Sequence, residues 1–203
     1  MAGTELLLLG GKPGSGKSTM AQTMIELKDA PAGALHLSVG EHLRGIGGGT
    51  IDSAFTEILA ENTDTIAQDK SVPDEVTMGV IGEFITLHED SGLVIIDGLR
   101  APDSLDRFKS VVRDVGARVL AVCEAVVDDE TVFERIRTRG QRYAKIAEDR
   151  EFIKKRLLTY NECMVPTLDL MRQEYPYHAL DGTQTAAVNA THLLRVYQEY
   201  TTA

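Results

Sequence analysis

The chain has 203 residues, enough for one domain with a sizeable hydrophobic core. Its 31 acidic residues outnumber its 21 basic ones, and the net charge of −10 argues against a broad nucleic-acid interface or a lasting hold on anionic membranes. The two cysteines form no metal or redox motif and are typical of a reduced cytoplasm. The apolar run Leu6–Leu9 is too short to span a membrane and lacks the basic leader of a signal peptide.

Short apolar runs alternate with longer helical patterns along the chain. The strands predicted in chain order are 5–9, 34–38, 93–96, 117–127 and a short last strand within 178–182. The predicted helices are 17–27, a turn at 40–44 followed by a flexible loop, 52–61, 74–88, 103–114, 129–139, 148–174 with a bend at Pro166, and 184–200. Strands that are apolar on both faces and separated by helices indicate a parallel sheet covered on both sides, which is a three-layer α/β/α fold. In such folds the ligand binds at the carboxyl ends of the strands.

The segment GKPGSGKS, residues 11–18, matches the pattern G-x-x-x-x-G-K-[ST] of a phosphate-binding loop. Glycines at this spacing let backbone N–H groups turn towards phosphate oxygens, and the helix that follows adds its positive dipole end. The lysine then reaches the β and γ phosphates, and a hydroxyl of the next two residues faces Mg²⁺. The alternative is a plain glycine-rich turn between a strand and a helix. The predicted ATP-binding residues of this loop are Gly14, Ser15, Gly16, Lys17, Ser18 and Thr19.

A second signal is the carboxylate that ends the buried run LVIIDG, residues 93–98. An acidic side chain at the end of an apolar strand is costly unless something compensates its charge, and beside a phosphate-binding loop that partner is Mg²⁺ with its waters. Asp97 and Ser18 are therefore the predicted metal-binding residues, the alternative for Asp97 being a helix cap. The five histidines show no ligand spacing and are interpreted as surface or core residues.

The third signal is a local reversal of charge. Residues 135–156 contain nine basic residues against three acidic ones, whereas the rest of the chain is strongly acidic. Arg135, Arg139 and Arg156 are predicted beside the apolar stripes of their helices, where several guanidinium groups favour a polyanion between them. Such a clamp suits phosphoryl transfer, in which charge spreads over the transferred group. The alternative is a solvated basic face, and it is the preferred interpretation for Arg137, Lys154 and Lys155.

In order along the chain, these motifs resemble those of the adenylate kinase family of nucleoside monophosphate kinases. The resemblance rests on GKPGSGKST, HLSVGEHLR, VPDEVTMGVIGEFI, IIDGLRAPDSLDRF and the pair ERIRTRG and FIKKRLLTYNECMVPTLDLM, and it covers nearly the whole chain. It implies a single P-loop kinase domain over 1–203 and a monomer. The core would comprise 1–35, 67–137 and 150–203, with an acceptor-binding insertion at 36–66 and a short lid at 138–149.

The resemblance also implies roles for individual residues. Lys17 would bridge the donor and acceptor phosphates, and Asp97 would anchor the magnesium waters. Arg139 and Arg156 would grip the phosphates in transit, while Arg135 would stack on the donor adenine. The acceptor phosphate would be held by Arg44, with Ser38 and Arg100 in the same site, and Arg142 or Lys145 would act as the lid cation.

Some positions depart from the family pattern. The phosphate-binding loop ends in Lys-Ser-Thr where the family usually has Lys-Gly-Thr. Arg100 stands one position earlier than the arginine of the family's Asp-Gly-Phe-Pro-Arg motif. The glutamine with which the family reads an acceptor adenine falls near Leu105, and the family's threonine after Ser38 is Val39. These departures affect recognition of the acceptor base more than binding of the phosphates.

The function predicted from these residues is transfer of the ATP γ-phosphoryl group to a nucleoside monophosphate, with Mg²⁺ as cofactor. The family resemblance makes AMP the first expectation for the acceptor and leaves its base open. Two alternatives remain: a kinase of a small hydroxylated metabolite, for which Asp97 would serve as general base, and an ATP-binding regulator that has lost catalysis.

Overall fold

The computed structural model describes residues 3–61, 72–99, 105–138 and 150–201. Its centre is a sheet of five parallel strands in the order β2-β3-β1-β4-β5. The strands are β1 (Glu5–Gly11), β2 (Leu35–Ser38), β3 (Leu93–Asp97), β4 (Arg118–Val126) and β5 (Tyr177–Asp181). Each strand runs in the same direction because a helical connection carries the chain back across the sheet, as the alternating sequence pattern predicts.

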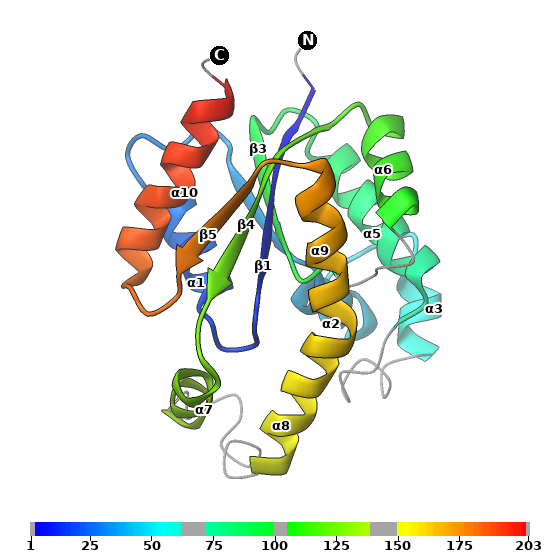
Figure 1. Cartoon of the computed structure of the whole chain (residues 1–203). Helices are drawn as coiled ribbons and strands as arrows, with labels where there is room; N and C mark the ends of the chain where they lie inside the picture. Colours follow the sequence, from blue (N-terminus) through cyan, green and yellow to red (C-terminus); the bar gives the residue numbers. More distant parts are fainter. Residues whose placement is uncertain (1–2, 62–71, 100–104, 139–149, 202–203) are drawn as a thin grey trace.

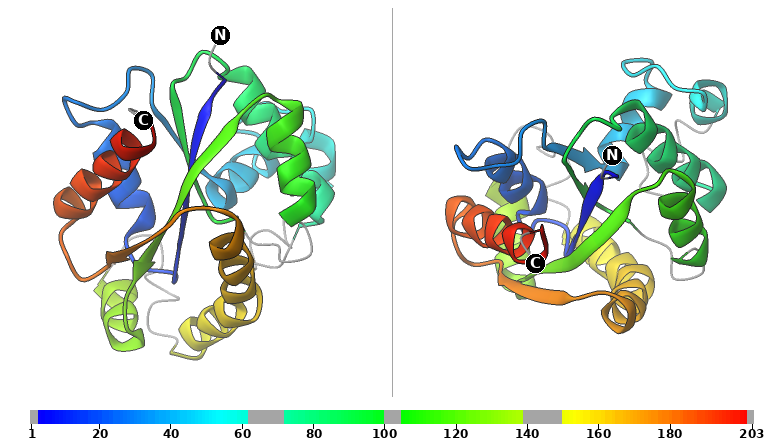
Figure 2. Two further views of the ribbon diagram at one scale, coloured as in Figure 1. Left: turned by 45° about the horizontal axis from the view of Figure 1, so that its top comes forward. Right: turned by 90° about the horizontal axis from the view of Figure 1, so that it is seen from above.

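Side chains of β1 alternate between two hydrophobic cores, one on each face of the sheet. Leu6 and Leu8 lie in the first core, and Leu7 and Leu9 lie in the second. The first core is covered by α2 (Val39–Gly47), α3 (Thr56–Glu61), α5 (Asp74–Leu87), α6 (Leu105–Asp114) and α9 (Val165–Glu174), and the second by α1 (Lys17–Ile25) and α10 (Ala186–Thr201). Figures 1 and 2 show the sheet between these two helical layers, which confirms the predicted three-layer α/β/α fold.

Two helices stand apart from these layers, beyond the carboxyl ends of the strands. They are α7 (Asp129–Thr138) and α8 (Arg150–Thr159), seen below the sheet in Figure 1. They share a small core of their own, in which Val132 and Ile136 of α7 contact Ile153 and Leu157 of α8. This core holds the two helices, with Arg135 on α7 and Arg156 on α8, at the edge of the sheet where ligands of α/β proteins bind.

Two elements differ from their predicted form. The segment predicted as a short turn and a flexible loop is a helix as far as Gly47, because Ile46 continues the buried stripe of Val39 and Leu43. The long helix predicted over 148–174 contains a π-helical turn, Tyr160–Met164, between α8 and α9. Pro166 cannot donate a backbone hydrogen bond, so the irregular winding falls just before it.

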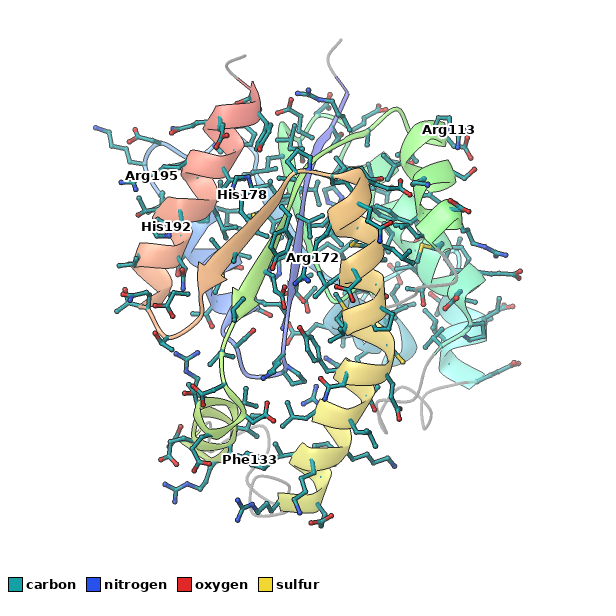
Figure 3. The ribbon with its side chains drawn as sticks, in the orientation of Figure 1. Arg113, Phe133, Arg172, His178, His192 and Arg195 are labelled. Atoms are coloured by element: carbon teal, nitrogen blue, oxygen red, sulfur yellow. The ribbon has the colours of Figure 1, made fainter. Side chains whose placement is uncertain are left out.

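A buried carboxylate ties the π-helical turn and α9 to the sheet. Glu124 of β4 accepts hydrogen bonds from the hydroxyls of Tyr160, at 3.1 Å, and Tyr177, at 2.5 Å, and it pairs with the guanidinium of Arg172. Arg172 points from α9 towards the sheet (Figure 3) and lies 4.4 Å from the ring centroid of Tyr177. Three side chains that lie 36, 48 and 53 positions further along the chain are therefore joined at one carboxylate.

Replacing Glu124 with alanine is expected to lower the free energy of unfolding by about 3 kcal/mol, because two tyrosine hydroxyls and one guanidinium lose their shared acceptor. Urea denaturation of the variant measures the loss. Tyr160→Phe removes one of the hydrogen bonds and should cost only about 1 kcal/mol. Equal losses in the two variants would show that the carboxylate contributes no more than one ordinary hydrogen bond.

Candidate active site

The loop between β1 and α1 is shaped by glycines in the left-handed region of backbone conformation. Gly14 and Gly16 have φ values of 79° and 94°, which other residues rarely adopt. A Cβ atom at Gly14 would lie 3.1 Å from Cγ1 of Ile136, so the loop passes close to α7. The N–H of Ser15 donates to the carbonyl of Lys12 at 3.1 Å and closes the turn. The chain thus enters α1 with the free N–H groups of a helix N-terminus at the loop, an arrangement that attracts anions.

The side chain of Lys17 folds back over this loop. Its Nζ donates to the carbonyls of Gly11, at 2.8 Å, and Lys12, at 2.9 Å, and lies 3.5 Å from Oγ of Ser15. The ammonium charge is therefore held at the loop by acceptors that phosphate oxygens can replace with a stronger, charge-assisted bond. The lysine and the loop therefore lie together, as the motif requires of a phosphate-binding loop.

Asp97 ends β3 and receives polar side chains from the elements around it. Register pairs it with Leu9 of β1 and Ser38 of β2. Oδ2 accepts from the hydroxyl of Ser18 at 2.9 Å and lies 2.8 Å from Nε2 of His36, while Oδ1 accepts from the hydroxyl of Ser38 at 3.3 Å. The carboxylate thus accepts a hydrogen bond directly from the serine that closes the phosphate-binding motif.

The pKa of the Asp97 carboxyl lies below its usual value of 3.8. Burial, the largest single influence, raises the pKa, but the hydrogen bond to His36, the charge of Lys17 and the hydroxyl of Ser18 together outweigh it. The side chain is 7% exposed, so this compensation takes place away from bulk water. Asp97 is consequently a carboxylate at neutral pH and can face a cation.

The lowered pKa predicts a specific pH dependence of stability. Because the folded protein binds the Asp97 proton less readily than the unfolded chain, the ionised carboxylate stabilises the fold above pH 3.8, and this contribution disappears as the pH falls through the lowered pKa. Asp97→Asn lacks the contribution at every pH. Urea denaturation without added metal should therefore show a stability difference between wild type and variant that shrinks as the pH is lowered from 6 to about 3. A difference that grows on acidification would contradict this sign.

His36 is a site residue that the sequence does not predict, because the five histidines show no ligand spacing. Its side chain is 8% exposed and contacts the carboxylate of Asp97, 61 positions further along the chain. One signal was present in the sequence: His36 and Ser38 are two residues apart in a predicted strand, so their side chains point to the same face. Two polar side chains on the same face of a short strand indicate that a polar group of a neighbouring strand lies beside them.

Two predicted arginines lie on different sides of the phosphate-binding loop. On α7, Nη1 of Arg135 donates to the carbonyl of Ser15 at 3.3 Å. On α2, the guanidinium of Arg44 folds towards the start of its own helix, where a Cβ at Gly40 would lie 3.5 Å from Nη1. Gly40 is in turn next to Gly98, which follows Asp97. Figure 1 shows α7 and α2 on either side of the loop that follows β1.

The remaining predicted residues divide into two groups. Arg156 is half-buried on α8, with its guanidinium carbon 5.9 Å from the ring centroid of Phe152, and Thr19 is exposed in the first turn of α1. The other group lies outside the described residues, so the roles implied for it stay predictions. It comprises Arg100, Arg139, Arg142 and Lys145.

The site combines a phosphate-binding loop at the carboxyl end of a parallel strand, a lysine over that loop, and a strand-end carboxylate that accepts a hydrogen bond from the serine of the loop. These features define a P-loop nucleotide-binding protein. Comparison with known proteins narrows this class. The family described as adenylate kinase matches residues 8–175. The chain belongs to the adenylate kinase family, and it is accordingly an ATP-dependent phosphotransferase of the nucleoside monophosphate kinase type.

Individual relatives resemble the chain over most of their length. It is 30% identical to adenylate kinase 1 of Synechocystis sp. over 202 residues, covering 95% of this chain and 97% of that protein. It is 28% identical over 180 residues to the adenylate kinase of Phocaeicola vulgatus, covering 88% and 90% of the two chains. The adenylate kinase of Porphyromonas gingivalis is also 28% identical over 180 residues, with 88% of each chain covered.

Proposed function

We propose that the chain transfers the γ-phosphoryl group of magnesium-bound ATP to AMP. The observation that carries this proposal is the convergence of Lys17, Ser18 and Asp97 at the carboxyl ends of β1 and β3, between the arginines of α7 and α2. Donor and acceptor would then approach the loop from opposite sides. Because a phosphate oxygen of the acceptor is already a nucleophile, the reaction needs positioning and charge neutralisation more than a general base.

Each residue has a distinct part in this proposal. Lys17 exchanges the carbonyls of Gly11 and Lys12 for phosphate oxygens, and the N–H groups at the start of α1 hold the donor phosphates. Arg135 contacts the donor nucleotide next to Ser15. Arg44, with Ser38, holds the phosphate of the acceptor. Arg156 stabilises the charge that develops on the phosphoryl group in transit, together with Arg139.

The donor atoms around Asp97 suit Mg²⁺. The carboxylate and the hydroxyls of Ser18 and Ser38 are oxygen donors, which this hard cation prefers, and one carboxylate with substrate phosphates is a common way of binding it. Asp97 and Ser18 would hold the ion, directly or through its waters. When bound, Mg²⁺ neutralises charge on the phosphates. His36 would keep the carboxylate oriented through its contact with Oδ2.

The proposed division of the chain into core, acceptor-binding insertion and lid also places the donor and the acceptor on opposite sides of the phosphate-binding loop. We propose residues 36–66 as the acceptor-binding insertion and 138–149 as a short lid that carries the cations Arg142 and Lys145, with Arg100 in the acceptor site. The active unit is proposed to be a monomer that acts on free nucleotides, and the cytoplasmic location stays a prediction. Among the described residues, no helix is long and apolar enough to cross a membrane.

A phosphotransfer assay with MgATP and AMP, CMP, UMP, GMP or dTMP in turn, with ATP hydrolysis as the blank, tests the proposal. Selective transfer to AMP would support it. Leu105, at the position of the family's base-reading glutamine, is 6% exposed within the core and cannot hydrogen-bond a base. Comparable transfer to several monophosphates would therefore show that the acceptor is not AMP alone. Binding of ATP without transfer to any of them would favour an ATP-binding regulator or a metabolite kinase.

A further inference from the structure

A second lysine of the phosphate-binding loop makes contacts that the motif does not describe. Lys12 occupies one of the unspecified positions of the pattern, and its side chain leaves the loop towards the turn between β4 and α7. Its Nζ donates to the carbonyl of Val127 at 2.9 Å and pairs with Oδ1 of Asp129 at 2.6 Å. Asp129 is the first residue of α7. Lys12 therefore joins the phosphate-binding loop to the beginning of this helix.

The same helix contacts the loop again near its other end. Arg135 donates to the carbonyl of Ser15, and Ile136 lies so close to Gly14 that a Cβ there would be 3.1 Å from its Cγ1. The helix thus lies along the loop, with Lys12 at its first turn and Arg135 at its last. A shift at the first contact would move the second, because an α-helix behaves as a rigid rod over ten residues.

The start of α7 is fixed independently, which makes it a firm attachment point. The carboxylate of Asp128 caps the helix: Oδ1 accepts from the N–H of Thr131 at 2.8 Å and Oδ2 from its hydroxyl at 2.9 Å. The side chain of Lys12 is 25% exposed and that of Asp129 is 61% exposed, so the ion pair alone contributes little. The bond to the carbonyl of Val127, a residue that is 6% exposed, adds the directional part of the contact.

We infer that Lys12 is a positioning residue for the donor nucleotide: it sets the placement of α7 against the phosphate-binding loop, and so the placement of Arg135 over the donor site. This inference rests on the proposed function. The proposed acceptor residues Ser38 and Arg44 belong to β2 and α2 respectively, on the other side of the loop. Loss of the Lys12 contacts therefore weakens the handling of ATP and leaves the handling of the acceptor nearly unchanged.

The test compares three variants of the full chain. Lys12→Met keeps the length of the side chain and removes its charge, and it is expected to raise KM for ATP about fivefold while KM for AMP stays within about twofold. Lys12→Arg can still donate to both acceptors and should restore most of the ATP affinity. Lys154→Met is the matched control, because Lys154 is an exposed lysine on α8 whose partner is Glu151 of the same helix, and it should leave both constants unchanged. A rise in both KM values with Lys12→Met would overturn the inference.

Asp129→Asn separates positioning from direct contact with ATP. If Lys12 acts through α7, this variant weakens ATP binding in the same direction as Lys12→Met, and the double variant is less than additive. If Lys12 instead contacts the phosphates directly, freeing it from Asp129 leaves ATP binding equal or tighter, which overturns the inference. The chain has no tryptophan, so titration calorimetry is the suitable measurement of ATP binding. Calorimetry tests Lys12 even if the wild type phosphorylates no monophosphate, an outcome that would reject the proposed function alone.

Discussion

Replacing Lys17 with methionine is expected to lower kcat for phosphoryl transfer by roughly a thousandfold or more, because the variant loses the ammonium that the carbonyls of Gly11 and Lys12 hold at the phosphate-binding loop. Methionine has a similar length but cannot donate a hydrogen bond or carry charge. The phosphates of donor and acceptor would then repel each other without the cation between them. A coupled assay of ADP formation with AMP as acceptor measures the effect.

The fold of this variant should be unaffected. The two contacts that Lys17 makes with the carbonyls of Gly11 and Lys12 are only partly buried, so water replaces the lost donor at little cost. Lys28→Met is the matched control, since Lys28 is exposed beyond the end of α1 and should keep wild-type activity. Full activity of Lys17→Met would reject the assignment of this lysine. An unfolded variant would show that the lysine is needed for the loop itself.

Asp97→Asn is expected to lower kcat about a hundredfold at saturating ATP, because asparagine keeps the shape of the side chain but removes the charge that faces Mg²⁺. The hydroxyls of Ser18 and Ser38 remain as oxygen donors, so a weakened metal site persists. Raising the Mg²⁺ concentration should therefore recover part of the lost activity. The measurement is kcat as a function of free Mg²⁺ at a constant, saturating concentration of MgATP.

His36→Gln is a useful companion to Asp97→Asn. Glutamine can still donate a hydrogen bond to Oδ2 of Asp97, so it should retain most of the activity and the wild-type dependence on Mg²⁺. His36→Phe removes the donor and should shift that dependence to higher concentrations. An activity loss in Asp97→Asn that Mg²⁺ does not relieve at any concentration would instead favour the general-base role that a metabolite kinase requires.

Features that depend on local pattern could be predicted from the sequence. The alternation of Leu6 to Leu9 between two cores, the strand-loop-helix unit around Lys17 and the placement of Asp97 at a strand end all follow from residues that are close in the chain. Their side chains point where the periods of strands and helices direct them. The sequence predicts the ends of helices less accurately. The helix α2 is longer than predicted, because burial of Ile46 decides where it ends.

The sequence by itself therefore determined the fold class, the phosphate-binding loop and the carboxylate that faces it. The tertiary structure decided the partners: His36 at the carboxylate of Asp97, Glu124 at three distant side chains, and Lys12 at the turn before α7. Each of these contacts joins residues between 36 and 117 positions apart. Local periodicity specifies which face of an element is buried, but not which polar group will meet it there, because strand order and helix placement bring those groups together only in the folded chain.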